Sequence, residues 1–126
     1  MIKGRKLDHI GLASCKPAED AQWYHDVLGF EEAGKFAHNG GYVYFMQTGT
    51  TVYEIYNDPA ASSKIDHIAY VSEDIEADYN YCKEQGYQFT TPGIMTIKDF
   101  WEHGIQYFKI ASPGGEEIEF ITKIKA

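Results

Sequence analysis

Cysteines are scarce in this 126-residue chain, and so are long apolar runs. Its two cysteines, Cys15 and Cys82, lack the spacing of a metal-binding motif, so reduced thiols in a cytoplasmic protein are expected. Cys82 follows a helical pattern and is expected in the core. No apolar stretch approaches the length of a membrane-spanning helix. The basic start, residues 1–6, has no apolar segment behind it and does not resemble a signal peptide.

Basic residues are fewer than acidic ones. The chain has 11 Lys and Arg against 19 Asp and Glu, which gives a formal net charge of −8. Such a chain is a poor partner for nucleic acid or an anionic membrane, and we expect it to bind neither. A small anionic substrate is compatible with this charge, because it responds to the local field. The length fits one domain, and a hydrophobic content of 44% is ample for a folded core.

One segment of the chain occurs twice. The sequence LDHIGLAS at residues 7–14 is repeated as IDHIAYVS at residues 65–72. Both copies are typical of strands, because aliphatic and β-branched residues dominate them and polar residues bound them. Alternation along a strand places His9 on a face with small residues such as Gly11, and His67 with Ala69, while bulkier neighbours point to the core. We therefore predict open space in front of each imidazole.

A glutamate recurs in the same manner, inside an apolar strand near the end of each half. Glu54 lies within residues 52–56 and Glu119 within residues 117–121. A buried carboxylate is costly unless it is paired or binds a metal. Imidazole and carboxylate together suit Zn, Ni, Fe or Mn, and the ligand types do not choose among them. The candidate metal ligands are therefore two histidines and two glutamates: His9, Glu54, His67 and Glu119.

The other three histidines lack an equivalent in the opposite half. A single buried histidine is more often a core residue than a ligand, so the matched positions of His9 and His67 are what favours a metal. We expect His25 on a solvated helix face and His38 in a turn. His103 falls in a loop, and we expect a surface residue there, with closure over the pocket as the alternative.

Hydrophobic periodicity predicts the order strand, helix, strand, strand, strand in each half. We expect one domain over residues 1–126, with module one at about 6–57, a linker at about 58–64 and module two at about 65–123. In module one the expected strands are about 6–13, 31–37, 41–48 and 51–57, and a helix begins at Pro17, buries Ala21, Tyr24 and Leu28, and stops at Gly29. In module two we expect a strand carrying His67, a helix ending near Gln85, a short strand at 88–91, a loop over 92–104, and strands at 106–110 and 116–123.

These motifs resemble the vicinal oxygen chelate superfamily. The resemblance rests on DHIGLAS and DHIAYVS at the start of the halves, on WYHDVLGFEE at residues 23–32, and on SPGGEEIEF at residues 112–120. The group includes glyoxalase I, methylmalonyl-CoA epimerase, extradiol dioxygenases and bleomycin resistance proteins. The resemblance implies an α+β fold in which tandem βαβββ modules form a curved, cup-shaped mixed sheet with helices on the outside.

The same resemblance implies a metal at the floor of the cup. Its ligands would be the four residues named above, and two His with two Glu is most similar to glyoxalase I (lactoylglutathione lyase). The implied function is a divalent-metal-dependent lyase or isomerase that acts on a thiohemiacetal or α-hydroxycarbonyl through a metal-bound enediolate. Glu119 would move the proton, with Glu54 as its counterpart. Ala13 stands where glyoxalase I commonly has an arginine that holds the glutathione carboxylate.

Three alternatives stay open. An epimerase of the methylmalonyl-CoA type usually has Gln where Glu54 stands. An extradiol dioxygenase would use His9, His67 and Glu119. A metal-free binding or resistance protein would carry out no metal-dependent reaction. Because modules of this family often pair across two chains, the resemblance also implies a homodimer.

Overall fold

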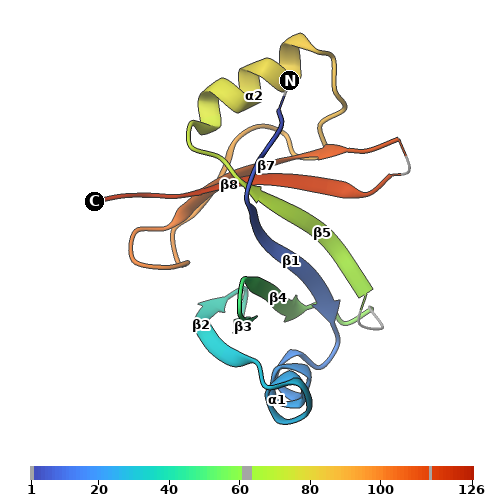
Figure 1. Cartoon of the computed structure of the whole chain (residues 1–126), viewed down its shortest axis with the longest axis vertical. Helices are drawn as coiled ribbons and strands as arrows, with labels where there is room; N and C mark the ends of the chain where they lie inside the picture. The colour runs from blue at the N-terminus through green and yellow to red at the C-terminus, as the bar shows by residue number, and fades with distance from the viewer. Residues whose placement is uncertain (1, 61–63, 114) are drawn as a thin grey trace. The chain divides into compact units, whose positions relative to one another are not determined.

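The computed structural model describes residues 2–60, 64–113 and 115–126, which form eight strands and two helices (Figure 1). The chain divides into two compact units. The first unit is His9–Asp66, and the second unit combines the residues up to Asp8 with His67–Ala126. Strand, helix, strand, strand, strand is the order in both halves of the chain, so the predicted α+β class with two βαβββ repeats is confirmed. Neither helix in the described part of the chain is long and apolar enough to cross a membrane.

The first repeat begins two residues before the first unit. Its elements are β1 (Leu7–Ser14), α1 (Pro17–Leu28), β2 (Glu31–His38), β3 (Gly41–Thr48) and β4 (Thr51–Asn57). The strands lie in the order β2-β3-β4-β1, with β1 parallel to β4 and the other pairs antiparallel. Asn39 and Gly40 close the β2–β3 hairpin with positive φ angles of 49° and 79°, as a two-residue primed turn requires.

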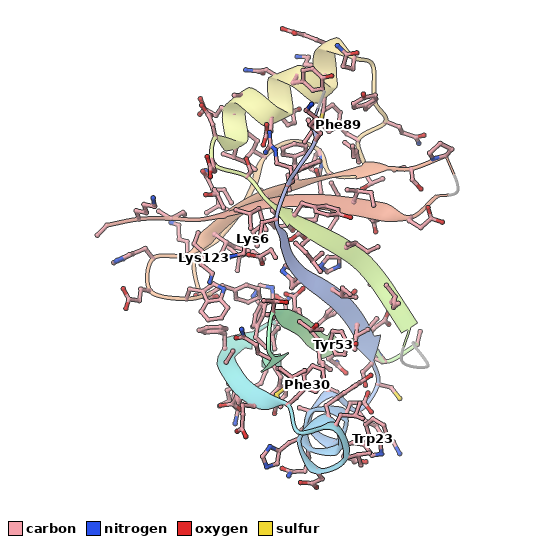
Figure 2. The ribbon with its side chains drawn as sticks, viewed as in Figure 1. Lys6, Trp23, Phe30, Tyr53, Phe89 and Lys123 are labelled. Carbon is pink, nitrogen blue, oxygen red and sulfur yellow. The ribbon has the colours of Figure 1, made fainter. Side chains whose placement is uncertain are left out.

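Helix α1 covers one side of this sheet. Pro17 stands at its start, and Gly29 ends it with a left-handed φ of 74°. The core beneath the helix includes Phe30, whose ring stacks on Tyr53 with centroids 5.0 Å apart (Figure 2). Leu28 was expected to share this core, but it is 53% exposed. Because the chain turns at Gly29, Phe30 fills the place that the periodic pattern assigned to Leu28.

The second repeat follows the same plan with a longer connection. Its elements are β5 (Lys64–Val71), α2 (Ile75–Glu84), β6 (Met95–Ile97), β7 (Ile105–Ala111) and β8 (Glu117–Lys123). They lie in the order β5-β8-β7-β6, with β5 parallel to β8 and the other pairs antiparallel. Figure 1 shows α2 beside the β7–β8 hairpin, and the predicted core position of Cys82 is confirmed, because Cys82 is fully buried there together with Ile75.

Two predictions for the second repeat are wrong. Residues 92–104 are not wholly a loop, because they contain β6, and residues 88–91 contribute only an isolated bridge from Phe89 to Ile110. Each of these segments is too short for alternation to be visible in the sequence, and pairing with β7 decides their conformation. Part of the predicted linker at 58–64 lies outside the described residues.

Asp78 is a buried carboxylate on α2 that the sequence analysis missed. It is 7% exposed and accepts two hydrogen bonds from the Arg5 guanidinium, at 2.5 and 2.8 Å, and one from the Ser72 hydroxyl at 2.7 Å. Burial raises the pKa of Asp78, but the hydrogen bonds from Arg5 and Ser72 outweigh it, so the pKa lies below its ordinary value. Within the second unit, this network ties the start of the chain to α2.

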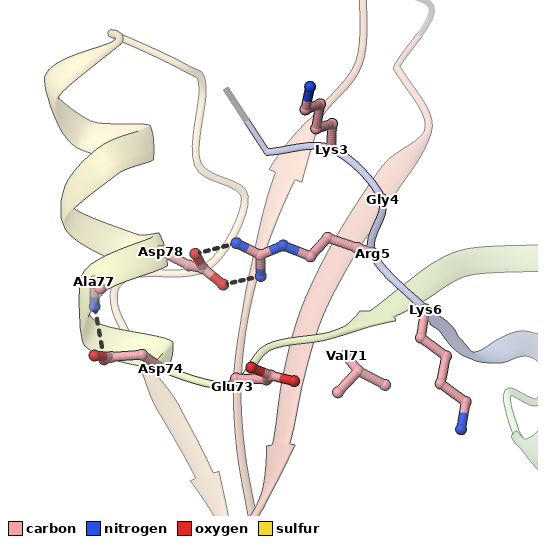
Figure 3. Close-up of a pocket in the computed structure, with 9 residues that line it drawn as sticks. All are labelled: Lys3, Gly4, Arg5, Lys6, Val71, Glu73, Asp74, Ala77 and Asp78. Carbon is pink, nitrogen blue, oxygen red and sulfur yellow. Dashed lines mark hydrogen bonds and ion pairs between the residues drawn. The ribbon is translucent and has the colours of Figure 1, made fainter.

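A cavity of about 530 Å³ lies beside this network (Figure 3). Its lining has three cationic and three acidic side chains: Lys3, Arg5, Lys6, Glu73, Asp74 and Asp78. Arg5 is held by Asp78, and Asp74 caps α2 by accepting from the backbone N–H of Ala77. Since the charges balance and several of them have structural partners, the cavity has no net preference for an anion or a cation.

Candidate metal centre

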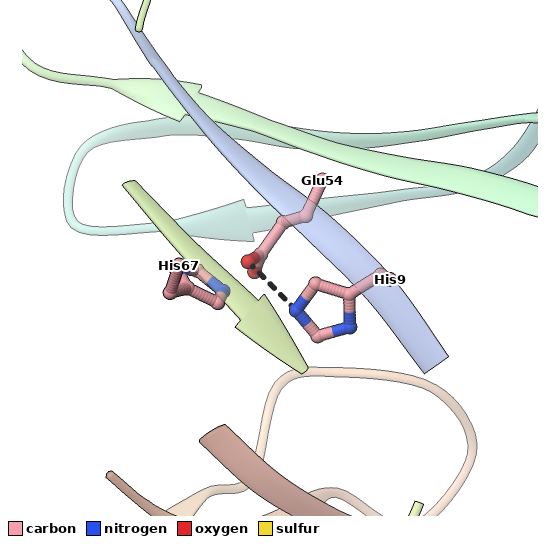
Figure 4. Close-up of side chains that lie close together, drawn as sticks. All are labelled: His9, Glu54 and His67. Carbon is pink, nitrogen blue, oxygen red and sulfur yellow. Dashed lines mark ion pairs between the residues drawn. The ribbon is translucent and has the colours of Figure 1, made fainter. Parts of the chain in front are cut away.

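His9 and Glu54 form a buried pair within the first unit. His9 is 1% exposed and Glu54 9%, and Nε2 of the histidine lies 3.3 Å from Oε1 of the glutamate (Figure 4). The register of β1 and β4 explains the contact, because Gly11 lies opposite Glu54 and His9 is two residues earlier on the same face. Because Gly11 has no side chain, it leaves room for the Glu54 carboxylate to reach the His9 imidazole.

His67 and Glu119 repeat this arrangement within the second unit. They are 4% and 5% exposed, and Nε2 of His67 lies 3.6 Å from Oε1 of Glu119. Ala69 takes the position opposite Glu119 in the parallel β5–β8 pair. Each unit therefore brings one predicted histidine and one predicted glutamate together, with a small residue in the same place.

The separation within the His9–Glu54 pair suits two ligands of a divalent ion. Separations of 3.3 and 3.6 Å are longer than a charge-assisted hydrogen bond, which is about 2.8 Å. Two atoms bound to an ion at about 2.1 Å each lie roughly 3.0 to 3.4 Å apart, depending on the angle between the bonds. The His9–Glu54 separation falls in this range, and the 3.6 Å of His67–Glu119 slightly exceeds it. His9, Glu54 and His67 are each buried and each offers a ligand atom. The donor set fits a divalent metal.

The open space that alternation predicts in front of each imidazole stays a prediction. The small-residue face was identified correctly, but both histidines on it are buried. In the first unit part of the cover is Phe45, whose ring meets the His9 imidazole edge-on at 5.7 Å. Water is therefore scarce at His9, which strengthens any charge interaction there.

The two pairs differ in the side chain that lies opposite the glutamate. Phe45 of β3 is opposite Glu54, whereas Lys109 of β7 is opposite Glu119. The sequence does not reveal that Phe45 and Lys109 occupy equivalent positions, because β3 and β7 have no motif in common. In the sequence, only the charge of Lys109 within a largely apolar strand marks this position as unusual.

Tyr56 was also missed by the sequence analysis. It lies two residues after Glu54 on β4, so both side chains leave the same face of the strand. Burial, followed by a hydrogen bond to the Asp66 carboxylate, raises the pKa of Tyr56. The phenol therefore stays protonated and donates to Asp66 throughout the ordinary pH range.

The remaining histidines are placed on the periphery of their units. Nδ1 of His25 lies 2.9 Å from the carbonyl oxygen of Phe30, and the side chain is 48% exposed, in keeping with the predicted solvated helix face. His38 is the last residue of β2, just before the hairpin turn. His103 is 44% exposed and lies 3.7 Å from Glu102, as expected of a surface loop residue. Closure of this loop over a site stays a prediction.

Comparison with known proteins identifies the relatives of this chain. Residues 6–120 match the family model described as the glyoxalase/bleomycin resistance protein/dioxygenase superfamily. An uncharacterized protein of Bacillus subtilis, YwbC, is 27% identical over 128 residues, which cover 94% of this chain and 98% of that protein.

Two solved structures illustrate the likeness in fold. The hypothetical protein BH1468 from Bacillus halodurans is 24% identical with a TM-score of 0.80, and the match covers 98% of this chain and 99% of that one. A methylmalonyl-CoA epimerase variant from Streptomyces coelicolor, in complex with 2-nitronate-propionyl-CoA, is 16% identical with a TM-score of 0.78, covering 96% and 99%. At these identities the structures show a shared fold.

Proposed function

This chain belongs to the glyoxalase/bleomycin resistance protein/dioxygenase superfamily, and from that membership we propose that it is a divalent-metal-dependent lyase or isomerase of the glyoxalase I type. Its substrate would be a thiohemiacetal or an α-hydroxycarbonyl, whose neighbouring oxygens can bind one ion together. The reaction moves a proton between adjacent carbons and needs no oxidant or reductant.

The observation that carries the proposal is the pair of equivalent His–Glu contacts. Nε2–Oε1 separations of 3.3 and 3.6 Å occur at matching register positions of the two repeats. We therefore propose that all four side chains hold one ion: His9, Glu54, His67 and Glu119.

A bound divalent ion would polarise the substrate oxygens and stabilise the negative charge that develops on them. Glu119 takes the proton from the carbon acid and returns it to the neighbouring carbon. Its burial at 5% exposure excludes water that would otherwise compete for that proton. Glu54 occupies the equivalent position in the first unit and serves as its counterpart, so a proton on either side of the substrate has a carboxylate within reach.

An epimerase is the second candidate. Its chemistry also begins with removal of a proton next to a carbonyl, and the same two carboxylates would serve it on opposite faces of one carbon. The likeness in fold to methylmalonyl-CoA epimerase supports its inclusion. An extradiol-type dioxygenase and a metal-free binding protein are distinguished from both by the tests below.

The proposal includes a homodimer in the cytoplasm. In this assembly the strands bearing His9 and Glu54 would complete a site with His67 and Glu119 of a partner chain. Sedimentation at micromolar concentration measures the assembly state. A monomer would contradict the dimer while leaving the metal chemistry untouched, because a site formed within one chain needs no partner.

Metal content is the first experiment. Protein purified without chelator should contain about one equivalent of Ni, Zn, Fe or Mn by elemental analysis, or should bind Ni or Zn on titration. His67→Ala should lose most of it, whereas His25→Ala, on the exposed side of α1, should retain it. A wild-type protein that neither contains nor binds metal would overturn the proposal in favour of a metal-free binding protein.

Turnover is the second experiment. Methylglyoxal is supplied with a panel of small thiols, glutathione among them, and the product is followed by absorbance. Turnover with any thiol supports the lyase. Turnover of a CoA ester alone would replace it with the epimerase, and oxygen consumption with a catechol would replace it with the dioxygenase.

A further inference from the structure

Phe45 lies beside both members of the His9–Glu54 pair in the first unit. It is opposite Glu54 in the antiparallel β3–β4 pair, and its ring meets the His9 imidazole edge-on, with centroids 5.7 Å apart and ring planes at 86°. Phe45 is 2% exposed, His9 1% and Glu54 9%, so the contact is buried. The phenyl ring is therefore placed to act on the geometry of the pair.

The contact between Phe45 and His9 spans a whole strand. Within the first unit β4 lies between β3 and β1, so the backbones that carry the two residues are about 10 Å apart. Their ring centroids are much closer, at 5.7 Å. Both side chains therefore lean toward each other over β4, on the face from which Glu54 projects.

The strand pairing does not require an aromatic ring at this position. In the second unit the equivalent position, opposite Glu119, holds Lys109, and the two strand pairs have the same antiparallel arrangement. Since either residue is compatible with the pairing, the explanation for Phe45 lies in its side-chain contacts. One of these is with the His9 imidazole.

Phe45 is in turn supported by Phe36 on the neighbouring strand β2. The two rings meet at 70° with centroids 5.9 Å apart, so Phe36, Phe45 and His9 form a series of edge-on contacts. Such contacts have a preferred geometry, which limits how far each ring can rotate. The series therefore restricts the imidazole at its end.

The orientation of this imidazole decides whether His9 can bind a metal beside Glu54. Nε2 now lies 3.3 Å from Oε1 of Glu54. A half-turn of the ring about the Cβ–Cγ bond would exchange Nε2 with Cε1 and leave a carbon, which is no metal ligand, at that place. Ligands must be held near their productive geometry by the packing of surrounding side chains. A rigid neighbour of His9 is thus expected to raise metal affinity.

We propose that Phe45 is a positioning residue, which holds the His9 imidazole with Nε2 directed toward Glu54 and thereby sets the affinity of the site for a divalent ion. This inference rests on the proposed function, because affinity is defined only if the site binds metal. Phe45 acts through His9 and takes no part in proton transfer.

The test replaces the ring by a branched aliphatic side chain. Phe45→Leu stays apolar but loses the flat edge that meets the imidazole. Phe30→Leu is the matched control, because Phe30 is also buried in the first unit but lies in the core beneath α1, on the other face of the sheet. Both variants lose part of a buried ring, so both should unfold at lower temperature than the wild-type.

Nickel binding distinguishes positioning from stability. Titration calorimetry is run on each protein below its unfolding transition. Phe45→Leu should weaken Ni binding by about tenfold or more, the scale of a lost outer-shell partner, and Phe30→Leu should leave it unchanged. A purely structural role would give the two variants the same affinity for Ni, which would overturn the inference.

A second measurement needs no metal. ¹³C relaxation of the His9 Cε1–H group in metal-free protein should show a rigid imidazole in the wild-type and in Phe30→Leu, and a mobile one in Phe45→Leu. Equal rigidity in all three proteins would overturn the positioning role and leave the metal site standing. If the wild-type binds no Ni, the proposed function fails, and relaxation still decides whether Phe45 holds His9. Where Ni binds, both effects are required, and the absence of either contradicts the inference.

Discussion

The two units place the same pair of side chains in the same register and surround it differently. His9 with Glu54 and His67 with Glu119 are each diagonal neighbours across a parallel strand pair. An antiparallel strand then supplies the residue opposite each glutamate, which is Phe45 in one unit and Lys109 in the other. Repetition thus supplies matched candidate ligands, while the neighbouring strand gives each His–Glu pair surroundings of different polarity.

A second difference concerns the helices. Each unit joins a serine to an aspartate on its helix: Ser14, the last residue of β1, to Asp20, and Ser72, the residue after β5, to Asp78. In the second unit Arg5 adds two further hydrogen bonds to Asp78. In the second unit the serine–aspartate contact is therefore part of a larger network that also anchors the start of the chain.

The sharpest test of the first comparison is to remove each carboxylate charge in turn. Glu119→Gln keeps the volume and a ligand oxygen but removes the base, and we expect it to lose turnover by about 100-fold or more. Glu54→Gln should lose less, because Glu119 remains. Turnover of methylglyoxal with the active thiol measures both. Equal losses would show that the two units share proton transfer, and near-normal turnover by Glu119→Gln would remove its assigned role.

Stability against pH tests the second comparison. Because the pKa of Asp78 is lowered in the folded protein, its contribution to the free energy of unfolding is present above its ordinary pKa of about 4 and is lost as the pH falls through the folded value. Asp78→Asn should reduce the free energy of unfolding at pH 7 by about 2 kcal/mol and flatten its decline below pH 4. Urea unfolding at pH 7 and pH 3 measures this.

Asp20→Asn is the matched control for that experiment, because it removes the equivalent carboxylate from the first unit. It should cost less than Asp78→Asn at pH 7, since the Arg5 contacts are untouched. Equal losses from the two variants would show that Arg5 adds nothing to the stability of the serine–aspartate contact.

The smallest expected effect compares two glycines with positive φ. Gly29 ends α1 with a φ of 74° and has no atom within 4 Å of an added Cβ, whereas Gly104, with a φ of 88°, has the carbonyl oxygen of Ile97 at 2.8 Å. Gly29→Ala should cost about 1 kcal/mol from backbone strain alone, and Gly104→Ala about 1 kcal/mol more. Thermal unfolding measures the difference. Equal costs would show that the loop before β7 yields to the methyl group.

Much of the candidate site was predictable because it depends on short-range patterns. Alternation along β1 and β5 placed His9 and His67 on the small-residue face, and the apolar setting of Glu54 and Glu119 marked both as buried carboxylates. The helix stop at Gly29 was predicted in the same way, since a left-handed cap is a local feature. By contrast, Leu28 was misplaced because the packing of Phe30 lies outside any helical period.

The sequence by itself determined the α+β class, the two βαβββ repeats and the identity of the four candidate ligands, because strand alternation and internal repetition can be read from neighbouring residues. Only the tertiary structure decided that Lys109 lies opposite Glu119, that Phe45 lies opposite Glu54, and that Arg5 reaches Asp78. The physical reason is that register and packing join residues far apart in the chain. A shift of one residue between two strands would reverse the face of every side chain without altering any local pattern.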